Sequence, residues 1–136
     1  MKRLFVAALA LAVLVGGPTL AHHSFAMFDP TKVQTLNGTL YSVEWKNPHS
    51  WFWIKVKTDK GQEQIWGLEG ASPSVFTRQN FTRKDFVIGE KVKVEYNPLR
   101  DGRTGGKFLR MTFADGRMVG SLDSAVDRFR KKGLIQ

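Results

Sequence analysis

Residues 50–57 read SWFWIKVK, a run rich in aromatic and β-branched side chains. Because successive side chains of a β-strand point to opposite faces, this run predicts a strand with one apolar and one mixed face. The apolar face carries Phe52, Ile54 and Val56, and the mixed face carries Trp51, Trp53 and Lys55. The strand therefore has one face to bury in a core and another that presents two tryptophans.

Two further strands flank residues 50–57 along the sequence. Residues 33–45 are rich in β-branched and aromatic residues with Gly38 in their middle, which predicts a long strand bent or bulged at the glycine. The turn signal at residues 59–61 leads into a third strand at about residues 63–69. We therefore expect the second and third strands to form a hairpin.

The chain then switches from strand signals to helix signals. Ser72 is followed by a proline at the first helical position, which predicts a short helix over residues 73–81. Residues 91–96 and 107–113 predict the fourth and fifth strands. An apolar stripe along residues 121–132 predicts an amphipathic helix near the C-terminus.

The predicted order of three strands, a helix and two strands matches an OB-fold, a partly open five-stranded β-barrel. We expect an all-β, OB-fold-like small β-barrel over residues 33–119, with an N-terminal arm at residues 22–32 and an extra C-terminal helix within residues 120–136. The expected core consists of Leu36, Leu40, Val43, Phe52, Ile54, Val56, Ile65, Val92, Val94, Leu109, Met111 and Phe113.

The N-terminal residues predict export. Lys2 and Arg3 precede an apolar run at residues 4–15 that is too short to span ~30 Å of hydrocarbon, which is typical of a secretory signal peptide. Cleavage after Ala21 would start the mature chain at His22 and place a soluble protein in the periplasm or outside the cell. We expect no membrane span after cleavage.

Composition excludes several classes of protein and narrows the partners. The chain has no cysteine, which excludes a disulfide framework, cysteine-ligated metal sites and a thiol nucleophile. It has 21 Lys and Arg against 12 Asp and Glu. Because an exported protein meets little nucleic acid, we expect no nucleic-acid partner but an anionic glycan, a lipid head group or another exported, acidic protein. The alternative is that the basic surface only keeps the protein soluble.

Four short motifs carry a resemblance to a known family. HHSF at residues 22–25, NPHSW at 47–51, GEKV at 89–92 and NPLRDG at 97–102 follow the signal peptide in this order. The chain resembles a domain-of-unknown-function family of small exported bacterial proteins over about residues 21–119. This family has no established activity, so the resemblance implies no chemistry for any residue.

The three histidines suggest a metal site. The α-amino group and imidazole of His22 would chelate one ion, with His49 or His23 as a further nitrogen ligand and Met27 as a soft fourth ligand. A nitrogen-rich tetragonal set favours Cu(II), and it requires unprotonated ligands, so it would form at neutral pH. The alternative is an arm whose histidines have no role, with His49 hydrogen-bonded within its own loop.

A second candidate site is the outer face of the second and third strands, the usual ligand surface of an OB-fold. Trp51 and Trp53 would line it, and the loop at residues 97–106 would add Arg100, Asp101 and Arg103. Such an aromatic and basic groove suits an anionic or glycan ligand. The alternative is that another segment covers the tryptophans and makes them part of the core.

The sequence favours a binding protein over an enzyme. No GxSxG, HExxH, SxxK or phosphate-loop motif occurs. Glu44 and Glu69 lie at strand ends, where we expect solvated carboxylates rather than acid–base groups. The first hypothesis is therefore an exported copper-binding protein, and the alternative is a module for an anionic or glycan ligand. A third hypothesis, a copper redox enzyme, would use the same histidines but needs an open coordination position and a substrate surface.

Overall fold

The computed structural model describes residues 27–120 and residue 133. The predicted signal peptide, His22, His23 and the predicted helix at residues 121–132 lie outside the described residues. No helix among the described residues is both long and apolar enough to cross a membrane.

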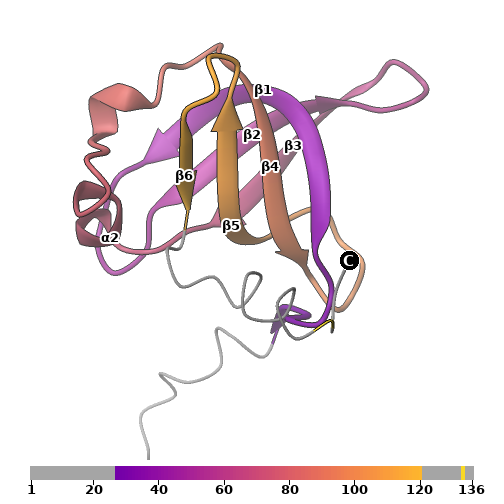
Figure 1. Ribbon diagram of the computed structural model, residues 1–136. Coiled ribbons are helices and arrows are strands. Elements are labelled where there is room, and N and C mark those ends of the chain that lie inside the picture. The colour runs from indigo at the N-terminus through magenta and orange to yellow at the C-terminus, as the bar shows by residue number, and fades with distance from the viewer. Residues whose placement is uncertain (1–26, 121–132, 134–136) are drawn as a thin grey trace, which may run out of the picture.

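The described chain is mostly β-sheet with a single short α-helix, as the sequence predicts (Figure 1). Its elements are β1 (Gln34–Glu44), β2 (Trp51–Lys57), β3 (Glu63–Glu69), α2 (Pro73–Thr77), a 3-10 helix η3 (Arg83–Asp85), β4 (Lys91–Pro98), β5 (Gly106–Phe113) and β6 (Met118–Gly120). Helix α2 is shorter than predicted, and β6 corrects the expectation of five strands. Strand β6 has three residues, too few for an alternating pattern to reveal it.

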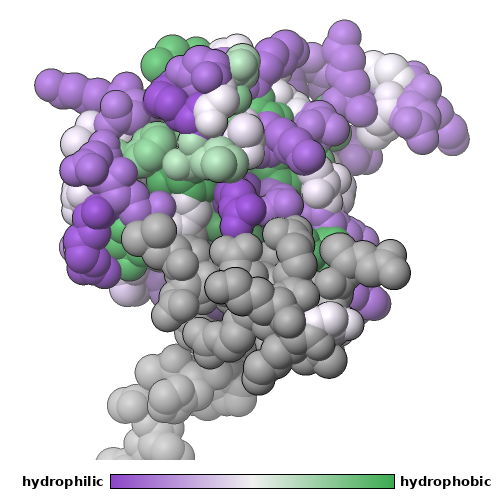
Figure 2. Space-filling view, viewed as in Figure 1, coloured by the Kyte–Doolittle hydropathy of each residue, from purple (hydrophilic) through white to green (hydrophobic). Residues whose placement is uncertain are grey.

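The strands form one sheet in the order β3-β2-β1-β4-β5-β6, and every neighbouring pair is antiparallel. Strand β5 also pairs in parallel with β3, through Leu68 with Gly106 and Glu69 with Lys107. The strand pairings therefore run from β3 through the sheet to β5 and back to β3. This arrangement brings the end of β3 beside the start of β5, which lie far apart in the sequence. The hairpin that joins β2 and β3 projects from the sheet, and its surface is hydrophilic (Figure 2).

Strand β1 is irregular, but not at the predicted position. The register between β1 and β2 shifts between Leu40 and Ser42, so the bulge lies after Gly38. Gly38 has a different role, because a Cβ atom there would lie 2.5 Å from the carbonyl oxygen of Lys55. The glycine allows the backbone of β2 to approach β1 closely.

The core fills the inner face of the sheet and includes nine of the expected residues in one cluster. Ile65 is a wrong prediction, because it pairs with Lys55 on the outer face of the sheet and is 40% exposed. Val56 is only partly buried, and Leu109 is buried outside the main cluster. The core residues that the sequence missed are Leu68, Phe76, Phe86, Tyr96, Phe108 and Val119.

Aromatic rings form the centre of the core. Phe52 packs against Phe108 with a centroid distance of 4.6 Å and against Phe86 at 5.1 Å. Helix α2 contributes Phe76, whose ring meets Phe52 edge to face. The helix therefore closes one end of the core. Because the core lies on the inner face of β2, the side chains on its outer face are available for a site.

Candidate functional site

Two tryptophans form a flat aromatic surface on the outer face of β2. The rings of Trp51 and Trp53 stack with centroids 5.9 Å apart and planes 20° apart. The Trp53 indole N–H donates a hydrogen bond to Glu44 at 3.2 Å. On β3, a Cβ atom at Gly67 would lie 2.6 Å from the Trp53 ring, so the ring lies over the glycine. The surface therefore depends on both tryptophans and on the absence of a side chain at Gly67.

The loop between β4 and β5 borders this surface and contributes the cationic side chain of Arg103. The Asp101 carboxylate accepts hydrogen bonds from the Arg103 backbone N–H at 3.1 Å and from its Nε at 2.8 Å. These two hydrogen bonds lower the pKa of Asp101, so the carboxylate remains ionised. Asp101 thereby restrains the guanidinium of Arg103 beside the tryptophans.

A pocket of about 370 Å³ lies between the aromatic surface and the loop. We call it the tryptophan pocket; Met27, Trp51, Trp53, Ile65, Leu99 and Arg103 are among its lining residues. The N-terminal arm contributes one wall, because the Arg100 backbone N–H donates to the Met27 carbonyl at 2.9 Å and Phe28 forms a β-bridge with Leu99. Flat rings with a neighbouring cation can stack on the face of a ligand and pair with its anionic group.

A second pocket, of about 310 Å³, lies at the junction of β3 and β5. We call it the histidine pocket; Pro48, His49, Glu69, Ser72 and Lys107 are among its lining residues. The Nδ1 atom of His49 lies 2.6 Å from the Glu69 carboxylate, whose side chain is only 11% exposed. Burial lowers the pKa of Lys107, and the negative charge of Glu69 opposes that shift.

The burial of Glu69 contradicts the expectation of a solvated strand end. The parallel pairing of β3 with β5 places Lys107 beside Glu69, and His49, in the loop between β1 and β2, contacts the carboxylate. Sequence reasoning also missed Lys107. The alternation of side chains along a strand does not reveal which strand lies beside it. The sequence pattern therefore could not predict that Glu69 of β3 and Lys107 of β5 are neighbours.

The structure brings together some of the predicted site residues and separates others. Trp51, Trp53 and Arg103 line one pocket, as expected for the aromatic groove. Asp101 contacts Arg103, whereas Arg100 meets the arm through its backbone. The other two tryptophans, Trp45 and Trp66, are partly buried and pack against the core.

The predicted copper ligands do not form a complete site within the described residues. His49 lines the histidine pocket, while Met27 is 45% exposed and lines the tryptophan pocket. Among residues 27–120 and 133, no group of three His, Cys, Asp or Glu side chains could hold a metal ion. His22 and His23 lie outside the described residues, so the copper site stays a prediction.

Comparison with known proteins places the chain in a family without assigning it a role. No curated protein and no solved structure matches it. A family model does match, and its matched residues include all four motifs that carry the resemblance noted above. The chain belongs to DUF6152, a family of unknown function, whose model matches residues 10–108.

Proposed function

We propose that the protein is a binding protein that holds an anionic glycan in the tryptophan pocket. The observation that carries this proposal is the presence of two stacked indoles and a restrained guanidinium around one pocket. The indole faces of Trp51 and Trp53 would stack on the sugar ring, and Arg103 would pair with a carboxylate or other anionic substituent.

We also propose that the sheet is an OB-fold-like β-barrel. Two observations support it: the circuit of pairings from β3 through β2, β1, β4 and β5 back to β3, and the helix between β3 and β4. OB-folds bind ligands on the face of their second and third strands, beside the loop that joins strands four and five. The tryptophan pocket has the same location relative to β2, β3 and the β4–β5 loop.

Calorimetry with an acidic oligosaccharide tests the proposed ligand class. We expect a uronic acid trisaccharide to bind, and the corresponding neutral trisaccharide to bind at least about tenfold more weakly because it lacks the partner of Arg103. The variants Trp51→Ala and Arg103→Gln should each weaken binding by a similar factor. The matched control is Tyr41→Ala, which removes an exposed aromatic ring outside the pocket. Equal binding by all variants would refute the proposal.

A copper site remains the second candidate, and one observation favours it. Histidines that bind metals usually donate their other ring N–H to a carboxylate, as the Nδ1 contact of His49 with Glu69 would allow. In that tautomer, Nε2 carries the lone pair that a metal ligand needs. We propose that export and cleavage after Ala21 would supply the remaining nitrogen ligands at His22.

Electron paramagnetic resonance during a Cu(II) titration tests this second candidate. A nitrogen-rich tetragonal signal is expected from protein that begins at His22 but not from a copy with one extra N-terminal methionine. Equal binding by both forms would exclude the N-terminal ligand. N-terminal sequencing of protein recovered from the periplasm tests export and the cleavage position independently.

A further inference from the structure

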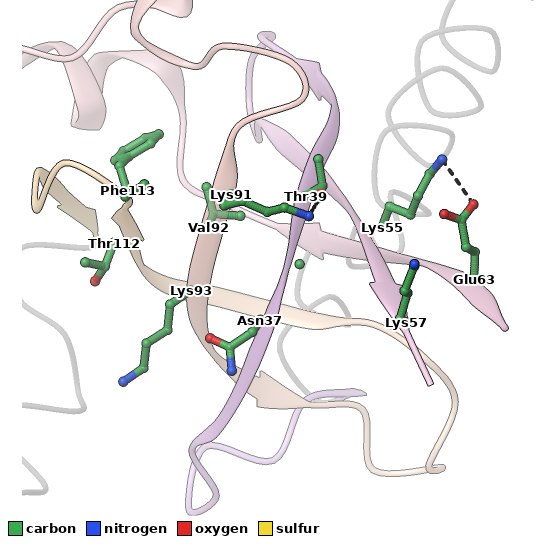
Figure 3. Close-up of a pocket in the computed structure, with 12 residues that line it drawn as sticks. Asn37, Thr39, Lys55, Lys57, Glu63, Lys91, Val92, Lys93, Thr112 and Phe113 are labelled. Carbon is green, nitrogen blue, oxygen red and sulfur yellow. Dashed lines mark hydrogen bonds and ion pairs between the residues drawn. The ribbon is translucent and has the colours of Figure 1, made fainter. Parts of the chain in front are cut away.

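A separate groove of about 480 Å³ lies on the outer face of β2, β1 and β4 (Figure 3). We call it the lysine groove, because Lys55, Lys57, Lys91 and Lys93 all line it. None of its lining residues lines the tryptophan pocket or the histidine pocket. Any ligand of this groove therefore contacts a different set of side chains from the proposed glycan.

The register of the sheet explains how the groove forms. Thr39 of β1 pairs with Lys55 on β2 and with Lys91 on β4, and Asn37 pairs with Lys93. Long cationic side chains therefore stand on the two flanking strands and short polar side chains stand on the strand between them. In Figure 3, Asn37 and Thr39 lie between the lysines of β4 and those of β2. The short side chains of β1 form the floor, and the lysines form the walls.

The groove keeps most of its positive charge. Lys55 is paired with Glu63, with a nitrogen–oxygen distance of 3.2 Å, and Lys91 donates a hydrogen bond to the Thr39 hydroxyl at 2.9 Å. Among the described residues, no carboxylate lies within ion-pair distance of Lys57, Lys91 or Lys93. Glu63 is the one acidic residue among those that line the groove. Closely spaced cations of this kind concentrate anions from solution.

We propose that the lysine groove binds an anion that carries two or more phosphate groups. Lysine ammonium groups bind phosphate as point charges, and an anion with several linked phosphate groups carries enough negative charge to pair with several of the lysines that line the groove. The Asn37 amide and the Thr39 and Thr112 hydroxyls add neutral hydrogen-bond donors around the lysines.

The spacing of the lysines explains why more than one phosphate is required. Residues two apart on a strand are about 7 Å apart, and the strands on either side of β1 are about 10 Å apart. One phosphate group cannot contact all four ammonium groups without drawing the long side chains away from their strands. Two linked phosphate groups place charge near both walls of the groove.

Titration calorimetry with inorganic tripolyphosphate tests the proposal on the purified protein. We expect one molecule to bind per chain, with an affinity that falls as salt is raised because the contacts are ionic. The double variant K57Q/K93Q should weaken binding by about tenfold or more. The control K60Q/K84Q removes the same charge from exposed lysines outside the groove and should leave the affinity within about twofold.

Three results would overturn the proposal. They are the absence of tripolyphosphate binding, an equal loss in both double variants, and binding to phosphatidylglycerol vesicles without binding to tripolyphosphate. The second result would mean that net charge alone attracts the anion, and the third would assign the surface to a membrane. Circular dichroism confirms that each variant is folded. Because W51A/W53A leaves the groove intact, its unchanged tripolyphosphate affinity would separate this site from the proposed glycan site.

Discussion

Replacement of Gly67 by alanine should disable the tryptophan pocket while the protein stays folded. A Cβ atom there would lie 2.6 Å from the Trp53 ring, whereas carbon atoms in ordinary contact are about 3.5–4.0 Å apart. The ring must therefore move by about 1 Å, which disturbs both its stacking on Trp51 and its hydrogen bond to Glu44. The lost ring stacking and indole hydrogen bond each cost about 0.5–1.5 kcal/mol. Replacing a glycine within a strand by alanine stabilises the fold by about 0.5–1 kcal/mol, because alanine loses less backbone entropy on folding. The net destabilisation is therefore about 1 kcal/mol.

Binding should change more than stability in this variant. Because the displaced ring no longer lies parallel to Trp51, we expect the affinity for an acidic trisaccharide to fall by at least about tenfold. Calorimetry gives the affinity, and urea denaturation gives the free energy of unfolding. Thr35→Ala, at an exposed position of β1 outside all three pockets, is the control. If G67A binds the trisaccharide as well as the wild type, the argument that the glycine positions the tryptophan is wrong.

Three further predictions address the core, the histidine pocket and the dependence of stability on pH. Phe52→Ala should lower the free energy of unfolding by about 3–5 kcal/mol, because the ring is fully buried; a loss below about 1 kcal/mol in urea denaturation would contradict its place in the core. Glu69→Gln should weaken Cu(II) binding by about ten- to a hundredfold if the carboxylate orients His49, and unchanged affinity would remove Glu69 from any such role. Hydrogen bonds from the Thr82 backbone N–H and hydroxyl lower the pKa of Asp85, so this carboxylate stabilises the fold above the unfolded pKa of about 3.9. D85A should therefore be less stable than the wild type at pH 7, and the difference should vanish as pH falls through the lowered pKa of Asp85; a difference that persists in acid would exclude this cause.

The alternation of side chains predicted most of the strands, because each strand pairs within a sheet that has one buried face. It predicted β3 at its observed bounds and assigned Phe52 and Ile54 correctly to the core. The prediction that Ile65 is a core residue was wrong, because the inner face of β3 carries the neighbouring residues Gln64 and Trp66. Local hydrophobicity does not reveal which face of a strand is buried. Phe76 and Phe86 were missed as core residues because they lie outside the strands and reach the core only through the tertiary fold.

The site could be predicted only where its residues share one strand or one loop. Trp51 and Trp53 share one face of β2, and Arg103 lies in a loop that the expected OB-fold order would place beside that strand. The neighbours of Glu69 come from segments far apart in the sequence, and no pattern along the chain joins His49 to Lys107. The lysine groove was missed for the same reason, because its walls belong to two strands that meet only across β1.

The most direct test of the proposed glycan site is a titration with the acidic trisaccharide, followed by the nitrogen-15 NMR signals of the indole N–H groups. The chain has four tryptophans, and two of them, Trp45 and Trp66, pack against the core and serve as internal controls. We predict that the Trp51 and Trp53 signals shift during the titration while the other two stay in place. Signals that all remain unchanged, or shifts confined to Trp45 and Trp66, would contradict a glycan site on the outer face of β2.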